Sequence, residues 1–160
     1  MNKHKVVMLG MWGVGKTSLV QRFVNSIYDE RYHTTLGVKV DKKVVEIDGA
    51  QTTLLLWDIA GAEDQFLVPS HYLHGASGYL IVIDGTRKAS LECALQLINR
   101  VEQDMGKLPY IPIINKCDLN WEITIEDVAR SLGTEQQIFV SSAKTDEQVA
   151  EAFLALARAI

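Results

Sequence analysis

A glycine-rich stretch near the N-terminus has the residue types and spacing of a phosphate-binding loop. Residues 10–17 read G-x-x-x-x-G-K-T, follow a short apolar run and open a segment with helical periodicity. Glycines let the backbone curl until its N–H groups point at phosphate oxygens, and a helix N-terminus adds positive potential. Lys16 would then reach the β- and γ-phosphates, and the Thr17 hydroxyl would bind Mg²⁺. The stretch predicts a site for a nucleoside triphosphate and magnesium; an ordinary strand-to-helix turn that precedes a lysine is the alternative.

Three later segments bear on which nucleotide this is. Asp58 follows an apolar run and could hold Mg²⁺ through water, and the N–H of Gly61 could reach a γ-phosphate. Residues 115–118, NKCD, include an aspartate that can accept two hydrogen bonds from guanine N1–H and its amine, a pair that adenine lacks. A buried polar group left unpaired costs about 1–3 kcal/mol, which rejects the wrong base. In residues 141–144, SSAK, a backbone N–H could meet guanine O6. Together the segments favour guanine.

Short apolar runs alternate with longer helical patterns, and this alternation predicts the framework that positions those residues. The expected strands are 5–9, 38–47, 52–57, 79–83, 111–114 and 138–140. The expected helices are 17–25, 90–105, 124–132 and 146–160, with a short helix candidate within 58–75. Asp48-Gly49 is a strong hairpin signal. The pattern predicts a three-layer α/β fold of the P-loop NTPase type, with a mostly parallel six-stranded sheet, one antiparallel edge pair and helices on both faces.

Length and composition set outer bounds on the protein. The chain has 160 residues, of which 48% are hydrophobic and 22% charged, so we expect one globular domain over 1–160 and exclude a disordered or collagen-like chain. The net charge of -4 argues against nucleic acid as the main partner. Two cysteines indicate a reducing, cytoplasmic setting. No apolar run approaches the ~20 residues of a membrane span, and the final residues hold no lipidation cysteine, so we expect no membrane anchor and no C-terminal hypervariable tail.

Five motifs occur in a fixed order along the chain: GMWGVGKT, HTTLG, WDIAG, NKCD and SSAK. With these motifs the chain resembles the Ras-superfamily small GTPases, closest to the Rab or Ras-like branch. The missing tail would fit a prokaryotic relative, a shortened form of a longer protein or one domain of it. The resemblance implies a GTP- and GDP-binding switch with Mg²⁺ as cofactor, expected to be a monomer. Effector and regulatory proteins would bind it through two loops, switch I and switch II.

The resemblance also implies a role for each matching residue. Thr35 would bind Mg²⁺ and the γ-phosphate, Tyr28 would lie against guanine, and Tyr32 would close over the phosphates. Lys116 would lie along the base, with Asp118 as its selector. The implied nucleotide-binding set is Gly10, Trp12, Gly13, Val14, Gly15, Lys16, Thr17, Ser18, Tyr28, Tyr32, Thr35, Gly61, Asn115, Lys116, Asp118, Ser142, Ala143 and Lys144. The implied metal ligands are Thr17, Thr35 and Asp58, and the implied catalytic residues are Lys16, Thr35 and Gly61.

Two positions depart from the family pattern. Ala62 stands where the family usually has a glutamine that orients the attacking water, and a methyl group can neither donate nor accept a hydrogen bond. Trp12 stands where a side chain crowds the γ-phosphate or packs on switch II. We therefore predict slow intrinsic GTP hydrolysis. The candidates for a substitute water-orienting group are His33, His71 and His74.

Two further functions stay open at this point. The first is a pseudo-GTPase, a constitutively GTP-bound interaction module without turnover. The second is an ATP-dependent kinase or ATPase, which rests on the phosphate loop alone and which residues 115–118 argue against.

Overall fold

The computed structural model describes residues 2–30, 37–59, 68–133 and 136–160. Its strands are β1 (Asn2–Leu9), β2 (Val38–Ile47), β3 (Ala50–Ile59), β4 (Ala76–Asp84), β5 (Tyr110–Asn115) and β6 (Phe139–Val140). Its helices are α1 (Lys16–Asn25), α2 (Lys88–Met105), α3 (Ile125–Leu132) and α4 (Val149–Ala159), with a 3₁₀ turn, η1, over Ser70–Tyr72. The predicted alternation of strands and helices is confirmed.

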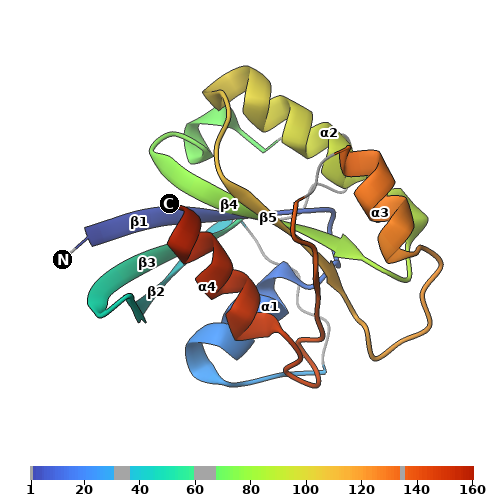
Figure 1. Cartoon of the computed structure of the whole chain (residues 1–160), viewed down its shortest axis with the longest axis horizontal. Helices are drawn as coiled ribbons and strands as arrows, with labels where there is room; N and C mark the ends of the chain where they lie inside the picture. The colour runs from blue at the N-terminus through green and yellow to red at the C-terminus, as the bar shows by residue number, and fades with distance from the viewer. Residues whose placement is uncertain (1, 31–36, 60–67, 134–135) are drawn as a thin grey trace.

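The strands form one sheet in the order β2-β3-β1-β4-β5-β6 (Figure 1). β1 pairs in parallel with β3 and β4, and the parallel pairing continues from β4 to β5 and from β5 to β6. Only β2 runs antiparallel, against β3 at the edge of the described sheet. Asp48 and Gly49, with φ of 51° and 80°, make the tight turn between β2 and β3, because such a turn needs two positive φ angles. The predicted fold, with its single antiparallel edge pair, is confirmed.

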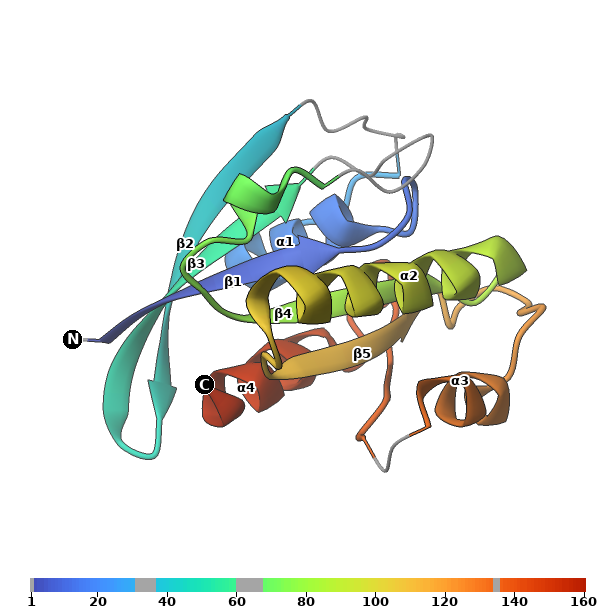
Figure 2. The same cartoon turned by 90° about the horizontal axis from the view of Figure 1, so that it is seen from above.

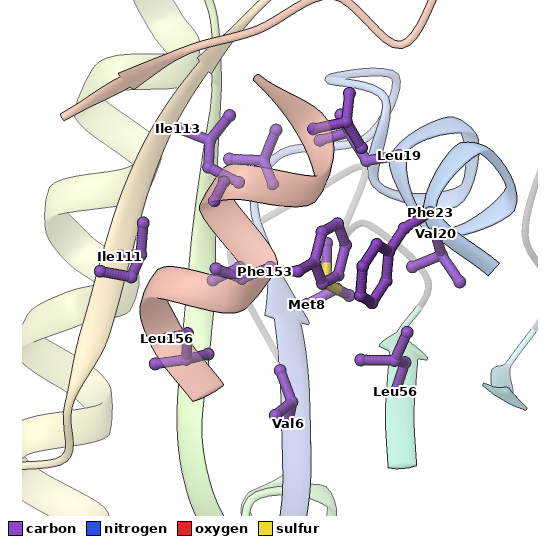
Figure 3. Close-up of a cluster of buried hydrophobic side chains, with 14 of the residues drawn as sticks. Val6, Met8, Leu19, Val20, Phe23, Leu56, Ile111, Ile113, Phe153 and Leu156 are labelled. Carbon is purple, nitrogen blue, oxygen red and sulfur yellow. The ribbon is translucent and has the colours of Figure 1, made fainter. Parts of the chain in front are cut away.

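Helices cover both faces of the sheet, with α1 and α4 on one face and α2 and α3 on the other (Figure 1). Each face buries its own hydrophobic cluster. Between α1 and α4, the rings of Phe23 and Phe153 stack with centroids 4.2 Å apart and planes 6° apart, above Met8 of β1 (Figure 3). This packing fixes α1, the helix that follows the phosphate loop, against the sheet.

The parallel strands bring the polar segments predicted from the sequence to one edge of the sheet. β1, β3, β4, β5 and β6 all end there, and Figure 2 shows the carboxyl ends of β1, β4 and β5 on the same side of the molecule. Open α/β sheets bind their ligands at this edge. The fold therefore positions the phosphate loop next to the segments that follow β3, β5 and β6.

The remaining differences from the predicted elements lie at their ends. Most strands extend one to three residues further than their apolar runs, because pairing with a neighbouring strand continues into polar positions such as Lys3, which pairs with Thr53. The last helix begins at Val149 and not at Asp146. Asp146 and Gln148 have left-handed φ angles of 65° and 51°, and a bridge joins Ser142 to Glu147, so the helix cannot start earlier. Among the helices of the described residues, none has the length and apolar character that a membrane crossing requires.

Candidate functional site

Gly10 and Gly15 give the phosphate loop its shape. Their φ angles are 151° and 104°, values that side-chain-bearing residues rarely adopt. A Cβ atom on Gly10 would lie 2.6 Å from the carbonyl oxygen of Val82, and one on Gly15 would lie 2.3 Å from Asn115 Nδ2. Gly13 also has a positive φ, of 72°. The loop therefore needs glycine at both ends, where it passes closest to β4 and β5.

The loop leads directly into the N-terminus of α1. Val14 is fully buried in the core, so it offers the loop only its backbone. The first hydrogen bond of the helix runs from Leu19 N to Gly15 O at 2.9 Å. The N–H groups of Lys16, Thr17 and Ser18 precede that bond and have no acceptor within the helix. These three donors, together with the dipole of α1, make an anion-binding helix end.

Lys16 folds its side chain back across the loop. Its ammonium donates to Gly10 O at 2.9 Å and to Met11 O at 3.2 Å, and only 6% of the residue is exposed. Burial lowers the pKa of Lys16 to about 8, although the nearby charge of Asp58 acts in the opposite direction. The loop thus holds a poorly solvated cation among its own carbonyl groups, where a phosphate oxygen would be a stronger acceptor.

Thr17 and Asp58 meet between α1 and the end of β3. Thr17 Oγ1 donates to Asp58 Oδ2 at 2.5 Å, and Asp58 is 1% exposed. No described residue donates to the second oxygen, Asp58 Oδ1. Burial raises the pKa of the Asp58 carboxyl above its ordinary value, and the Thr17 hydrogen bond and the Lys16 charge offset only part of this effect. An unpartnered buried carboxylate oxygen beside a hydroxyl fits the oxygen ligands that Mg²⁺ prefers.

Asn115 and Lys116, at the end of β5, hold the outside of the phosphate loop. Asn115 Nδ2 donates to Val14 O at 3.0 Å, and Ser141 Oγ in turn donates to Asn115 Oδ1 at 3.2 Å. Lys116 Nζ donates to Gly13 O at 2.9 Å. These contacts join segments that are about a hundred residues apart in the chain. The predicted base-binding segment and the predicted phosphate loop therefore form one connected site.

Asp118 is held in place by the segment after β6. Ser142 Oγ donates to Asp118 Oδ1 at 2.8 Å and accepts from Thr145 N at 3.1 Å. Asp118 itself is exposed, and no described residue donates to its other oxygen. The N–H of Ala143 lies 3.4 Å from Asn115 Oδ1, which is a long hydrogen bond. The arrangement presents one carboxylate oxygen and one weakly engaged N–H at the same end of the sheet.

Tyr28 lies near Lys144, which belongs to the segment after β6, and Arg22 of α1 contacts both residues. Arg22 donates to Ala143 O at 2.8 Å and to Lys144 O at 2.9 Å, and its guanidinium lies 6.0 Å from the centre of the Tyr28 ring. Lys144 Nζ pairs with Glu30 at 3.2 Å. The structure thus places Tyr28 near the segment after β6, which Arg22 also contacts.

The sequence as a whole agrees with this geometry. Residues 5–160 match the family model described as Ras family. The chain belongs to the Ras family. This Ras-family protein is 35% identical over 162 residues to the GTP-binding protein ypt2 of Schizosaccharomyces pombe. The matched region covers 98% of this chain and 80% of that protein.

Two other relatives are of the same kind. The Ras-related protein Rab-1 of Theileria annulata is 34% identical, over 98% of this chain and 73% of its own length. The Ras-related protein SEC4 of Saccharomyces cerevisiae is 33% identical, over 98% of this chain and 74% of its own length. The protein is therefore a Rab-like member of the Ras superfamily, as its five motifs predicted.

Several predicted site residues of this Ras-family protein lie outside the described residues, namely Tyr32, His33, Thr35, Gly61 and Ala62. Two of the histidine candidates lie at the amino ends of the parallel strands, opposite to the phosphate loop. His71 and His74 precede β4, and the backbone of His74 accepts from Lys5 in the first half of β1, whereas the phosphate loop follows its end. Lys5 lies four residues before the end of β1, which corresponds to about 13 Å of strand, so the structure does not bring His74 to the phosphate loop.

Sequence reasoning missed Asp84 and Arg87, which follow β4 and border the phosphate loop. Asp84 is fully buried, and Arg87 lies over Trp12 with its guanidinium carbon 5.0 Å from the ring centroid. Trp12 itself is 38% exposed. Asp84 ends a buried strand as Asn115 does, and Asp58 is the next-to-last residue of another, so this shared position is the signal that could have found it.

Gly85, the residue after β4, also contacts the NKCD segment through a neighbouring side chain. Its missing side chain makes room for Trp121, whose Nε1 donates to Lys116 O at 2.9 Å. A Cβ atom on Gly85 would lie 2.3 Å from that indole nitrogen. The close approach fixes the NKCD segment against the end of β4.

Proposed function

We propose that this protein is a guanine-nucleotide switch that binds GTP or GDP with Mg²⁺ and hydrolyses GTP slowly. The observation that carries the proposal is the meeting of three features at one sheet edge: the buried Lys16 ammonium, the Thr17–Asp58 pair and the Ser142–Asp118 pair. Relatives whose names describe GTP-binding and Ras-related proteins support the same function. Residues 1–160 would act as one nucleotide-binding domain.

In this proposal the phosphates lie between the loop and α1. Lys16 would turn from the loop carbonyls to the β- and γ-phosphates, and the N–H groups at the start of α1 would hold the phosphate oxygens. Thr17, Asp58 and Thr35 would hold Mg²⁺, which would neutralise charge on the phosphates. The poorly solvated ammonium and the unpartnered Asp58 oxygen support these roles.

Guanine would lie at the base side of the site, formed by Tyr28, Lys116, Asp118 and the segment 142–144. The unoccupied oxygen of Asp118 would accept from N1–H and the amine of guanine, and the N–H of Ala143 would donate to O6. Adenine has the opposite donor and acceptor pattern along this edge, so a carboxylate here disfavours it. The Ser142 hydrogen bond, which fixes the Asp118 carboxylate, supports this selectivity.

The switch itself would follow from the γ-phosphate. Its contacts to Thr35 and Gly61 would order two loops that are released after hydrolysis, and an effector would bind only the ordered state. The adjoining strand β2 offers a surface for that effector, because Val40 and Val44 are 48% and 42% exposed on one face. Val40 lies opposite Trp57 on β3, which adds a large aromatic side chain to that face.

Slow hydrolysis rests on Ala62, and replacing this residue tests it. We expect Ala62→Gln to raise the single-turnover rate of GTP hydrolysis at least about tenfold, because glutamine can hold the attacking water. The measurement is phosphate release from protein preloaded with GTP. Ala62→Leu, which adds volume without a hydrogen-bonding group, should stay at the unmodified rate. Equal rates for glutamine and alanine would mean that water positioning is not what limits hydrolysis.

The alternative proposal is a pseudo-GTPase that stays bound to GTP and acts as an interaction module, and Ala62 together with Trp12 favours it. The nucleotide that co-purifies with the protein, released by heat and resolved by ion-exchange chromatography, distinguishes the two. Mostly GDP supports a working switch, whereas mostly GTP supports the interaction module. Adenine nucleotides, or a protein that takes up no guanine nucleotide with Mg²⁺, would contradict both.

A further inference from the structure

Two neighbouring carbonyl groups of the phosphate loop are held from outside by cationic side chains. Arg87 Nη2 donates to Trp12 O at 2.5 Å, and Lys116 Nζ donates to Gly13 O at 2.9 Å. The two cations come from different elements, since Arg87 precedes α2 and Lys116 follows β5. The loop carbonyls are therefore fixed by groups whose positions the sheet determines.

Both cations converge on one buried carboxylate. Asp84 Oδ2 lies 3.1 Å from Arg87 Nε and 2.8 Å from Lys116 Nζ, and the Asp84 side chain is fully buried. Its other oxygen accepts from both the N–H and the hydroxyl of Thr86, at 2.9 and 2.7 Å. Burial raises the pKa of the Asp84 carboxyl, but the hydrogen bonds from Lys116 and Thr86 outweigh it and hold the pKa below its ordinary value. Asp84 is thus an anchored anion with a cation on each side of the loop.

The direction of a carbonyl fixes the direction of the next N–H, because the two point opposite ways across a trans peptide bond. With Trp12 O turned toward Arg87, the N–H of Gly13 points away from α2. With Gly13 O turned toward Lys116, the N–H of Val14 points away from β5, and its only contact among the described residues is a long one of 3.4 Å to Met11 O. The interior of the loop is where a phosphate would need these donors.

We propose that Arg87 is a positioning residue for nucleotide binding, which holds the Trp12–Gly13 peptide so that its N–H is aimed at the diphosphate. The inference rests on the proposed function. Asp84 orients Arg87, and Lys116 does the same for the next peptide, so the three side chains act as a clamp on the loop carbonyls. A loop oriented before binding does not lose that conformational freedom when the nucleotide arrives.

The test compares GDP with GMP, which lacks the β-phosphate, on nucleotide-free protein with Mg²⁺, by competition against a fluorescent guanine nucleotide. We expect Arg87→Ala to weaken GDP binding about tenfold and GMP binding much less. The Kd for GMP divided by the Kd for GDP should therefore fall. Arg130→Ala is the matched control, because Arg130 on α3 is 78% exposed and pairs only with Asp127 among the described residues. It should leave both Kd values unchanged.

Two outcomes would overturn the inference: unchanged GDP binding, or an equal loss for GDP and GMP, which is the mark of a general structural role. Arg87→Lys is the second variant. It keeps the charge beside Asp84 but loses the planar fork that reaches two acceptors, so the same ratio should fall by a smaller factor. A ratio equal to that of the unmodified protein would also contradict the clamp. If the unmodified protein binds no GDP, the proposed function itself fails.

Discussion

Replacing Lys16 by alanine should weaken the binding of GDP and GTP about a thousandfold. The ammonium is almost completely buried, and loop carbonyls and the charge of Asp58 compensate it in part. Removing one partner of a buried charged contact costs about 2–5 kcal/mol, and about 4 kcal/mol corresponds to a thousandfold change in Kd. Titration calorimetry of nucleotide-free protein with GDP and Mg²⁺ measures the effect directly.

The fold should survive this substitution. Burial lowers the pKa of Lys16, which means that the folded protein disfavours its charged form and gains little stability from it. Lys107→Ala is a suitable control, since Lys107 is exposed just after α2, at the sheet edge opposite to the phosphate loop. A Lys16→Ala protein that binds GDP within about twofold of the unmodified protein would rule out a phosphate role for Lys16.

Replacing Asp118 by asparagine should weaken guanine-nucleotide binding at least about a hundredfold and change the preferred base. Hydrogen bonds to a charged group contribute about 1.5–3 kcal/mol each, and the proposed contact to guanine has two of them. Ser142 Oγ donates to Asp118 Oδ1, so the asparagine oxygen should take that side and the amide nitrogen should face the base. A donor would then meet two donors of guanine.

The same argument predicts what the variant should gain. Xanthine carries a carbonyl at C2 in place of the amine, and that carbonyl can accept from the new amide. We therefore expect Asp118→Asn to bind xanthosine diphosphate more tightly than GDP, in competition assays against one labelled nucleotide. Asn120→Asp, two residues further along, is the control and should leave base preference unchanged. Retention of the GDP preference in Asp118→Asn would show that another group selects the base.

The fold and the composition of the site were largely predictable because both depend on local patterns. Four of the five motifs stand at the end of an apolar strand, and parallel strands bring those ends together without any further information. The start of the last helix was not predictable in this way. Its apolar periodicity is compatible with an earlier start, and only the left-handed backbone at Asp146 and Gln148 prevents it.

The Asp84–Arg87–Lys116 cluster could not be predicted from the sequence, for a different reason. Asp84 lies 32 residues from Lys116 in the chain and belongs to none of the five motifs. The two meet because β4 and β5 pair with Asp84 opposite Asn115, the residue before Lys116. Such a contact depends on strand register, and a register is set by the packing of the whole sheet.

The β2 strand combines an open hydrogen-bonding edge with charges that oppose its use by another copy of the protein. It is ten residues long and carries Lys39, Lys42 and Lys43, while the strand at the other edge, β6, has only two residues. If two copies aligned their β2 strands, lysines would face lysines in several registers, and such like-charge pairs are destabilising. The three lysines exceed the two acidic residues of β2, Asp41 and Glu46, by one charge, so the edge weakly disfavours pairing with a copy of itself and favours a strand with acidic side chains.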